Sequence, residues 1–259
     1  MLTAAADPVP TEIVRLDAVD STQTMAFDLA ASGAADGTVV VADYQRQGRG
    51  RRGRQWLAEP RAALLTSIVV RSRLAMPDLP LYSFAAALAV DDAVEAIGGR
   101  AARLKWPNDV LLDGRKVAGI LLESRTQPPD PAVVAVGIGL NLRQTAFPEA
   151  LAARATSVRL ATGVDVDRDD ALHALIAAFG RWRGRLEQQG FGPLRERWLA
   201  GSDTIGRTVD IDGVRGVAVD LAPDGALVIA DGSERRRVVA GEIGWQSGER
   251  LEANDAPRC

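Results

Sequence analysis

Three predicted strands follow one another in the stretch Arg103-Leu-Lys-Trp-Pro-Asn-Asp-Val-Leu-Leu-Asp-Gly-Arg-Lys-Val-Ala-Gly-Ile-Leu-Leu-Glu123. We place them at 103–106, 109–112 and 116–123, with Asp113-Gly114 as a tight turn between the last two. A further strand is expected at 132–138. The stretch therefore predicts a mixed sheet at the centre of the fold.

Both lysines of the chain, Lys105 and Lys116, lie in this stretch, although Lys and Arg together number 31 among 259 residues. Arginine presents a planar fork, whereas lysine presents a compact ammonium on a flexible stem. The two positions are therefore expected to need a point charge in a confined site. The alternative is compositional drift, with two lysines left by chance in an Ala- and Arg-rich chain.

Outward from this centre, strands and helices are mixed along the chain, which predicts an α+β fold. The remaining elements of the larger part are strands at 13–17, 38–44 and 62–70 and helices from Asp20/Ser21 to Gly33 and at 81–97, 169–190 and 193–200. Asp20 and Ser21 are the expected N-caps of the first helix.

The pattern changes after Gly201. Four short strands are expected at 205–211, 214–221, 226–230 and 234–240, separated by Asp- and Gly-containing turns, as is typical of a small antiparallel barrel. The sequence thus predicts a catalytic domain at 12–201, a barrel at 203–246, and flexible tails at 1–11 and 247–259.

The composition excludes several classes of function. A formal net charge of −3 argues against general binding to a nucleic-acid backbone. No run of about 18 apolar residues and no signal peptide is present, so we expect a cytoplasmic protein without membrane contact. The single cysteine, Cys259, excludes an internal disulfide, and the single histidine, His173, excludes a His/Cys metal cluster.

The segment between Tyr44 and Trp56 holds five arginines and three glycines in thirteen residues. Glycine allows close approach of the backbone, and guanidinium groups match phosphate and carboxylate oxygens. We expect its central part, the arginine loop (residues 46–54), to clamp an anion and to be disordered until one binds. A nucleic-acid arm and a solvated charge run are the alternatives.

Five motifs occur in a fixed order, and in order and spacing they resemble those of biotin protein ligases. They are Asp20-Ser-Thr-Gln23, Gln45 with Gly48-Arg-Gly-Arg-Arg-Gly53 and Trp56, Lys105-Trp-Pro-Asn-Asp109, Lys116-Val-Ala-Gly-Ile-Leu-Leu-Glu123, and Gly137-Ile-Gly-Leu-Asn141. The resemblance covers about residues 13–246. It implies a catalytic domain like that of class II tRNA synthetases, followed by an SH3-like barrel.

The resemblance also implies a two-step reaction in which biotin reacts with ATP to give biotinyl-5′-AMP, and a carrier-protein lysine then attacks the mixed anhydride. The residues implied as catalytic are Lys116, Arg49 and Arg51. Those implied for biotin are Ser21, Thr22, Gln23, Gln45, Gly48, Arg49, Gly50, Arg51, Lys116, Gly119 and Gly137. Those implied for ATP or the adenylate are Trp56, Lys105, Asn108, Asp109 and Asn141, with Asp109 expected to orient the incoming lysine or a Mg²⁺ ion.

Two departures from the family pattern are visible. Gln23 stands where the family usually has asparagine, and we expect the longer amide to keep the contact with a shifted backbone. Only twelve residues precede Ile13, too few for the winged helix that makes some members repressors, so specific DNA binding is not expected.

The implied partners are ATP, Mg²⁺ accompanying ATP without a dedicated metal site, biotin, and a biotin carboxyl carrier protein or domain. The sequence leaves open whether the chain forms a weak homodimer. A lipoate–protein ligase and a DNA-binding regulator remain as rival functions. The barrel is expected to serve the second step or the closing of the site, the alternative being that it covers an apolar face of the first domain.

Overall fold

The computed structural model describes residues 12–126 and 131–250. Seven strands form one large sheet in the order β1-β2-β3-β7-β6-β5-β4. They are β1 Ile13–Val19, β2 Val39–Gln45, β3 Ala63–Arg71, β4 Arg103–Lys105, β5 Asp109–Leu112, β6 Arg115–Arg125 and β7 Val133–Asn141. Only β1 and β2 pair in parallel; the other neighbours are antiparallel. The mixed sheet and the α+β class are thereby confirmed.

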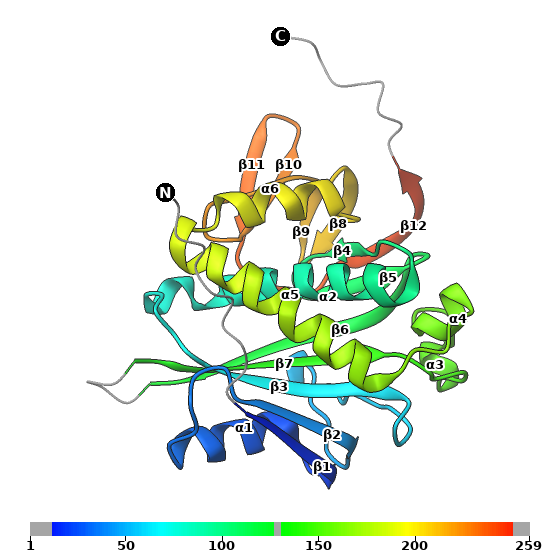
Figure 1. Ribbon diagram of the computed structural model, residues 1–259. Helices are drawn as coiled ribbons and strands as arrows, with labels where there is room; N and C mark the ends of the chain where they lie inside the picture. Colours follow the sequence, from blue (N-terminus) through cyan, green and yellow to red (C-terminus); the bar gives the residue numbers. More distant parts are fainter. Residues whose placement is uncertain (1–11, 127–130, 251–259) are drawn as a thin grey trace, which may run out of the picture.

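Helices cover the two faces of this sheet unequally (Figure 1). The long helices α2 (Tyr82–Gly98) and α5 (Arg168–Gln189) lie on one face, and the short helix α1 (Thr22–Ala31) lies on the other. Successive side chains of a strand point to opposite faces. Accordingly Val69 and Ala135 pack under α1, whereas their chain neighbours Val70 and Val136 belong to the core under α2 and α5.

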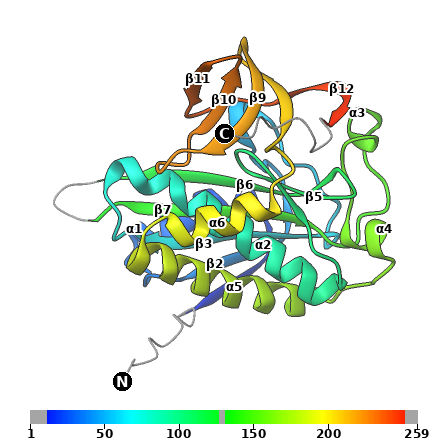
Figure 2. The ribbon, with the colours of Figure 1, turned by 90° about the horizontal axis from the view of Figure 1, so that it is seen from above.

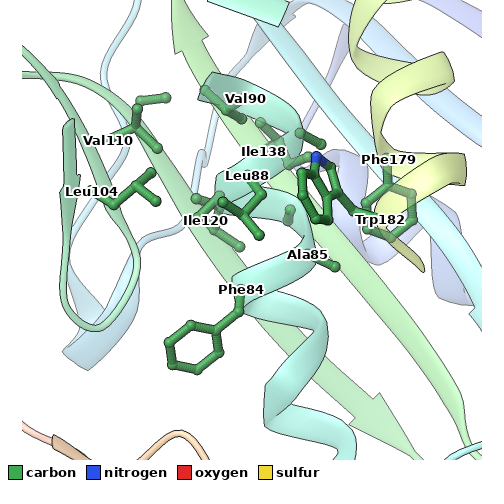
Figure 3. Close-up of a cluster of buried hydrophobic side chains, with 14 of the residues drawn as sticks. Phe84, Ala85, Leu88, Val90, Leu104, Val110, Ile120, Ile138, Phe179 and Trp182 are labelled. Atoms are coloured by element: carbon green, nitrogen blue, oxygen red, sulfur yellow. The ribbon is translucent and has the colours of Figure 1, made fainter. Parts of the chain in front are cut away.

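The main core lies between α2, α5 and the sheet. Leu88 of α2 lies close to Ile120 and Ile138 of the central strands, with Phe179 and Trp182 of α5 beyond it (Figure 3). Helix α5 begins where Asp167 accepts hydrogen bonds from the backbone of Asp169 and Asp170, and it ends before Gly190. The remaining helices are the 3₁₀ segments Arg51–Gly53 and Met76–Leu81, α3 Glu149–Ala152, α4 Val158–Thr162 and α6 Gly192–Gly201.

Five strands form a second, smaller sheet in the order β11-β10-β9-β8-β12. They are β8 Arg207–Ile211, β9 Val214–Leu221, β10 Leu227–Asp231, β11 Glu234–Val238 and β12 Gly244–Arg250. Sequence analysis missed β12, which continues four residues past the predicted end of the barrel at 246. Residues 1–11 and 251–259, predicted as flexible tails, lie outside the described residues.

The small sheet packs directly on the larger part of the molecule (Figure 2). Trp106, which is almost fully buried, donates its backbone N–H to Thr204 Oγ1 at 2.9 Å and its indole Nε1–H to Gly225 O at 3.1 Å. A Cβ added at Gly225 would lie 2.6 Å from the Phe84 ring. The two sheets therefore share one continuous apolar core, without a solvent layer at this contact.

None of the helices in the described parts of the chain combines the length and the apolar character needed to cross a bilayer.

Candidate active site

Three glycines form a bare patch on the sheet face that carries α1. Gly119 of β6 lies opposite Gly139 of β7, and Leu121 lies opposite Gly137. A Cβ added at Gly119 would lie 2.9 Å from Lys116 Nζ, one at Gly139 would lie 2.5 Å from the Trp56 indole, and one at Gly137 would lie 2.9 Å from Gln23 Cδ. This glycine floor, residues 119, 137 and 139, therefore brings together side chains that three separate motifs contribute.

The start of α1 borders the glycine floor. Thr22 donates both its backbone N–H and its hydroxyl to Gln45 Oε1, at 2.8 and 3.0 Å, and its hydroxyl also contacts Ser67 Oγ at 2.8 Å. These contacts tie the helix start to the end of β2 and to β3. Ser67 was not predicted, because its role arises from alignment across strands and not from a motif.

Ser21 is the N-cap residue of α1 by position, but its side chain makes no capping hydrogen bond. The expected N-cap position at Ser21 is therefore confirmed, without a side-chain hydrogen bond to the helix. Ser21 Oγ is buried and has no hydrogen-bond partner within the described residues. Since buried polar groups usually find a partner, this hydroxyl is available to a ligand at the floor.

Gln23 lies over Gly137 and reaches β6. Its Nε2 donates to Leu121 O at 3.1 Å and to Glu123 Oε2 at 3.2 Å. The same Glu123 oxygen accepts from Arg49 Nη2 at 2.7 Å. Glu123 ends one of the sequence motifs but was not assigned a role; its position at the end of that motif was the available signal.

Lys116 and Asp109 form an ion pair with Nζ 2.5 Å from Oδ1. The Lys116 ammonium also lies 5.6 Å from the centre of the Trp56 ring. The β4–β5 hairpin places Lys105 opposite Asp109, and β6 places Gly119 opposite Asp109 on its other side. Burial lowers the pKa of Lys105, partly offset by the charge of Asp109. Both lysines thus lie near one carboxylate, that of Asp109.

The arginine loop is closed by backbone hydrogen bonds from Trp56 N to Gly48 O (2.9 Å) and from Gly50 N to Arg54 O (2.7 Å). Arg51, inside this turn, donates to Asn108 Oδ1 at 3.2 Å, and burial lowers its pKa. The loop therefore places the partly buried Arg51 guanidinium against the β4–β5 hairpin.

The other four arginines of the loop have carboxylate partners: Arg46 with Asp20 (3.5 Å), Arg49 with Glu123 (2.7 Å), Arg52 with Asp212 (2.5 Å) and Arg54 with Glu242 (2.5 Å). The premise that nothing holds these arginines before an anion binds is therefore wrong. The sequence could not reveal it, because Asp212 and Glu242 lie some 160 or more positions away, on the small sheet.

The two motif asparagines, Asn108 and Asn141, differ in whether a side-chain hydrogen-bonding atom remains available to a ligand. Asn108 uses both ends of its amide, accepting from Arg51 and donating to Ile120 O at 2.6 Å, so it holds the loop to β6. Asn141 donates to Thr156 O at 3.0 Å, while its Oδ1 is buried without a partner in the described structure. Only Asn141 therefore keeps an acceptor for a ligand.

A cavity of about 530 Å³ opens beside Gln45, Gly48 and Trp56 and is bounded on its other side by Gln144 and Phe147. Gln144 is 3% exposed, and its Oε1 has no partner among the described residues. His173, by contrast, is exposed on α5, which covers the opposite face of the sheet. The predicted site residues thus gather at one place, and the single histidine lies elsewhere.

The site has lysine and arginine side chains at Lys116 and Arg51 and buried polar atoms without partners at Ser21 and Gln23, a combination suited to a ligand with an anionic part and a hydrogen-bonding part. Residues 16–141 match the Biotin/lipoate A/B protein ligase family. The biotin–[acetyl-CoA-carboxylase] ligase of Paracoccus denitrificans is 41% identical over 234 residues, covering 86% of this chain and 96% of that protein. The corresponding ligase of Mycobacterium tuberculosis is 38% identical, covering 88% of each.

Among solved structures, the biotin protein ligase from Aquifex aeolicus in complex with biotin and ATP is similar with a TM-score of 0.79 and 30% identity. That match covers 90% of this chain and 98% of the other. The chain therefore belongs to the Biotin/lipoate A/B protein ligase family.

Proposed function

We propose that this enzyme is an ATP-dependent ligase that activates biotin as biotinyl-5′-AMP and transfers it to a lysine of a biotin carboxyl carrier protein. Its 41% identity to a biotin–[acetyl-CoA-carboxylase] ligase over nearly that whole protein carries the proposal. The cationic cluster beside the glycine floor supports it, because the first step gathers negative charge at the α-phosphate.

In the first step, a biotin carboxylate oxygen attacks the α-phosphorus, and pyrophosphate leaves. Lys116 and Arg51 stabilise the charge that develops on the phosphate oxygens, and Arg49 steers the carboxylate. Biotin is surrounded by four polar side chains and four glycines: Ser21, Thr22, Gln23, Gln45, Gly48, Gly50, Gly119 and Gly137. The nucleotide is contacted by Trp56, Lys105, Asn108 and Asn141. Asn108 acts by holding Arg51 in place.

In the second step, the amine of the carrier lysine attacks the carbonyl of the mixed anhydride, and AMP leaves. Asp109, which contacts Lys116, orients the incoming lysine side chain. The lysine attacks as the neutral amine, and the proton released on amide formation passes to the solvent. Mg²⁺ would accompany ATP and would screen the charge of its phosphates. Asp109, beside Lys116, is the carboxylate that would hold it.

We also propose that residues 12–201 form a catalytic domain of the class II tRNA-synthetase type. The small sheet from 203 onward, with β12 included, then forms an SH3-like barrel. The end of α6 at Gly201 and the start of β8 at Arg207 support a boundary near 202, because the chain passes from the helix into the small sheet there. The protein acts in the cytoplasm.

The experiment is exchange of radiolabelled pyrophosphate into ATP, with and without biotin and without any carrier protein. We expect exchange that requires biotin. Exchange that ignores biotin, or that lipoate supports as well as biotin does, would contradict the proposal.

A further inference from the structure

The amide of Gln23 is held in one orientation by its neighbours. Its Nε2 faces Leu121 O and Glu123 Oε2, and both of these atoms are acceptors only. Turning the amide over would place its oxygen against two acceptors. Gln23 Oε1 must therefore point away from β6.

Gln23 Oε1 is a buried acceptor without a partner among the described residues. It lies 3.1 Å from the position that a Cβ of Gly137 would occupy, and the whole Gln23 side chain is buried, the residue being 4% exposed. Buried polar atoms without partners are uncommon, and leaving one unpaired is unfavourable. A ligand N–H at the glycine floor would satisfy it.

Glu123 links this amide to the arginine loop. Its Oε2 accepts from Gln23 Nε2 on one side and from Arg49 Nη2 on the other. The side chains of Arg49 and Glu123 are 42% and 33% exposed, so their ion pair alone contributes little to stability. Its more specific effect is geometric, since one carboxylate fixes both the direction of the Gln23 amide and the position of Arg49.

We infer that Glu123 is a positioning residue that turns Gln23 Oε1 toward a ring N–H of the ligand, and that this pair selects a cyclic urea over rings without N–H donors. The inference rests on the proposed function, since the ureido ring of biotin carries two N–H groups. A dithiolane ring, as in lipoate, carries none. A site that must satisfy a buried acceptor discriminates against the ligand that lacks the donor.

The test measures KM and kcat of biotin-dependent pyrophosphate exchange with biotin and with biotin methylated on one or the other ring nitrogen. The variants are Gln23→Met, which keeps the side-chain volume without the amide, and Glu123→Gln, which keeps the shape without the charge. Glu234→Gln is the matched control, because Glu234 also pairs with an arginine (Arg236, 2.8 Å) but lies on β11 of the small sheet.

In the unsubstituted protein, methylation of the nitrogen that faces Gln23 should lower kcat/KM about tenfold or more, the usual effect of losing a hydrogen bond to a buried group. In Gln23→Met the same methylation should cost less than about threefold, because the acceptor is already absent. Glu123→Gln should raise KM for biotin about three- to tenfold, and Glu234→Gln should change neither KM nor kcat.

Equal methylation penalties in Gln23→Met and the unsubstituted protein at both nitrogens would overturn the inference, because only steric exclusion would then act. An unchanged KM in Glu123→Gln would overturn the role of Glu123. If Gln23→Met does not fold, Glu123→Gln is measured with biotin and with the methylated biotins instead. If the losses in kcat/KM from Glu123→Gln and from methylation then simply add, Glu123 does not act through Gln23 and the inference fails. Loss of biotin dependence in the unsubstituted protein would reject the proposed function itself, and the inference with it.

Discussion

Lys116 is confined on three sides. Asp109 contacts its ammonium, the Trp56 ring centre lies 5.6 Å from Nζ, and a Cβ added at Gly119 would lie 2.9 Å from Nζ. A guanidinium is wider than an ammonium and needs its donors in one plane. The position therefore suits lysine for a steric reason, in addition to the electrostatic one.

We expect Lys116→Ala to slow formation of the adenylate by about 10²–10³-fold, because one preorganised charge at the transition state is lost. Lys116→Arg should restore little of this rate, since the wider guanidinium group does not fit over Gly119. Pyrophosphate exchange at saturating biotin and ATP measures both. Full activity of the arginine variant would show that position 116 does not require lysine.

Residues inside motifs were predictable, whereas their partners across strands were not. Lys116, Trp56 and Gln23 come together as predicted, because each motif ends or begins a strand at the same sheet face. Ser67 lies in ordinary strand sequence and Glu123 at the end of a motif, and the register of β3, β6 and β7 makes both of them neighbours of the site.

At the scale of elements, the arginine loop depends on Gly48. A Cβ there would lie 2.5 Å from the Trp56 carbonyl oxygen, which belongs to the backbone and cannot rotate away. The hydrogen bond from Trp56 N to Gly48 O would shift with it. The loop and the indole over the glycine floor are therefore positioned by one close backbone contact.

We expect Gly48→Ala to lower kcat/KM for biotin-dependent exchange by roughly 10- to 100-fold, because reacting groups are displaced by about an ångström. Gly184→Ala is the control: Gly184 lies within α5 with no atom near its Cβ position, so alanine should raise the free energy of unfolding by about 0.5–1 kcal/mol. Thermal unfolding and exchange rates measured on both variants provide the comparison, and normal exchange in Gly48→Ala would count against the close-contact argument.

Elements with strong periodicity were predicted within a residue or two, as α2 and α5 show. Strand β12 was missed because its sequence, Gly244–Arg250, has neither β-branched residues nor alternation; pairing with β8 creates it. The carboxylate partners of Arg52 and Arg54 were missed for a related reason, since they come from the distant small sheet.

For the whole molecule, two contacts of the small sheet with the catalytic part bear on its role, in addition to the hydrogen bonds that Arg195 of α6 donates to Asp220 Oδ1 and to Leu221 O. One is the shared core around Trp106 and Phe84, and the other is the pair of contacts from Arg52 and Arg54 to Asp212 and Glu242. The first supports the alternative that the sheet covers an apolar face. The second agrees with a role in closing the site.

A chain that ends after Gly201 should therefore be insoluble or unfolded, because it would expose Trp106 and leave both of its hydrogen bonds unmade. Glu242→Gln should fold normally, with stability within about 0.5 kcal/mol, because an exposed ion pair contributes little. Protease cleavage of residues 46–54 should nevertheless be faster in this variant. A soluble, biotin-binding fragment after truncation would show that the shared core is dispensable.

The two lysines acquire a further meaning when the product of the first step is considered. An acyl adenylate acylates amines, and any lysine near the site competes with the carrier for it. This chain contains only two lysine side chains, and Lys116 is already held by a carboxylate. Arginine, with its very high pKa, offers no nucleophile at neutral pH. Because its surface carries arginine in place of lysine, the enzyme is protected from acylation by its own adenylate intermediate.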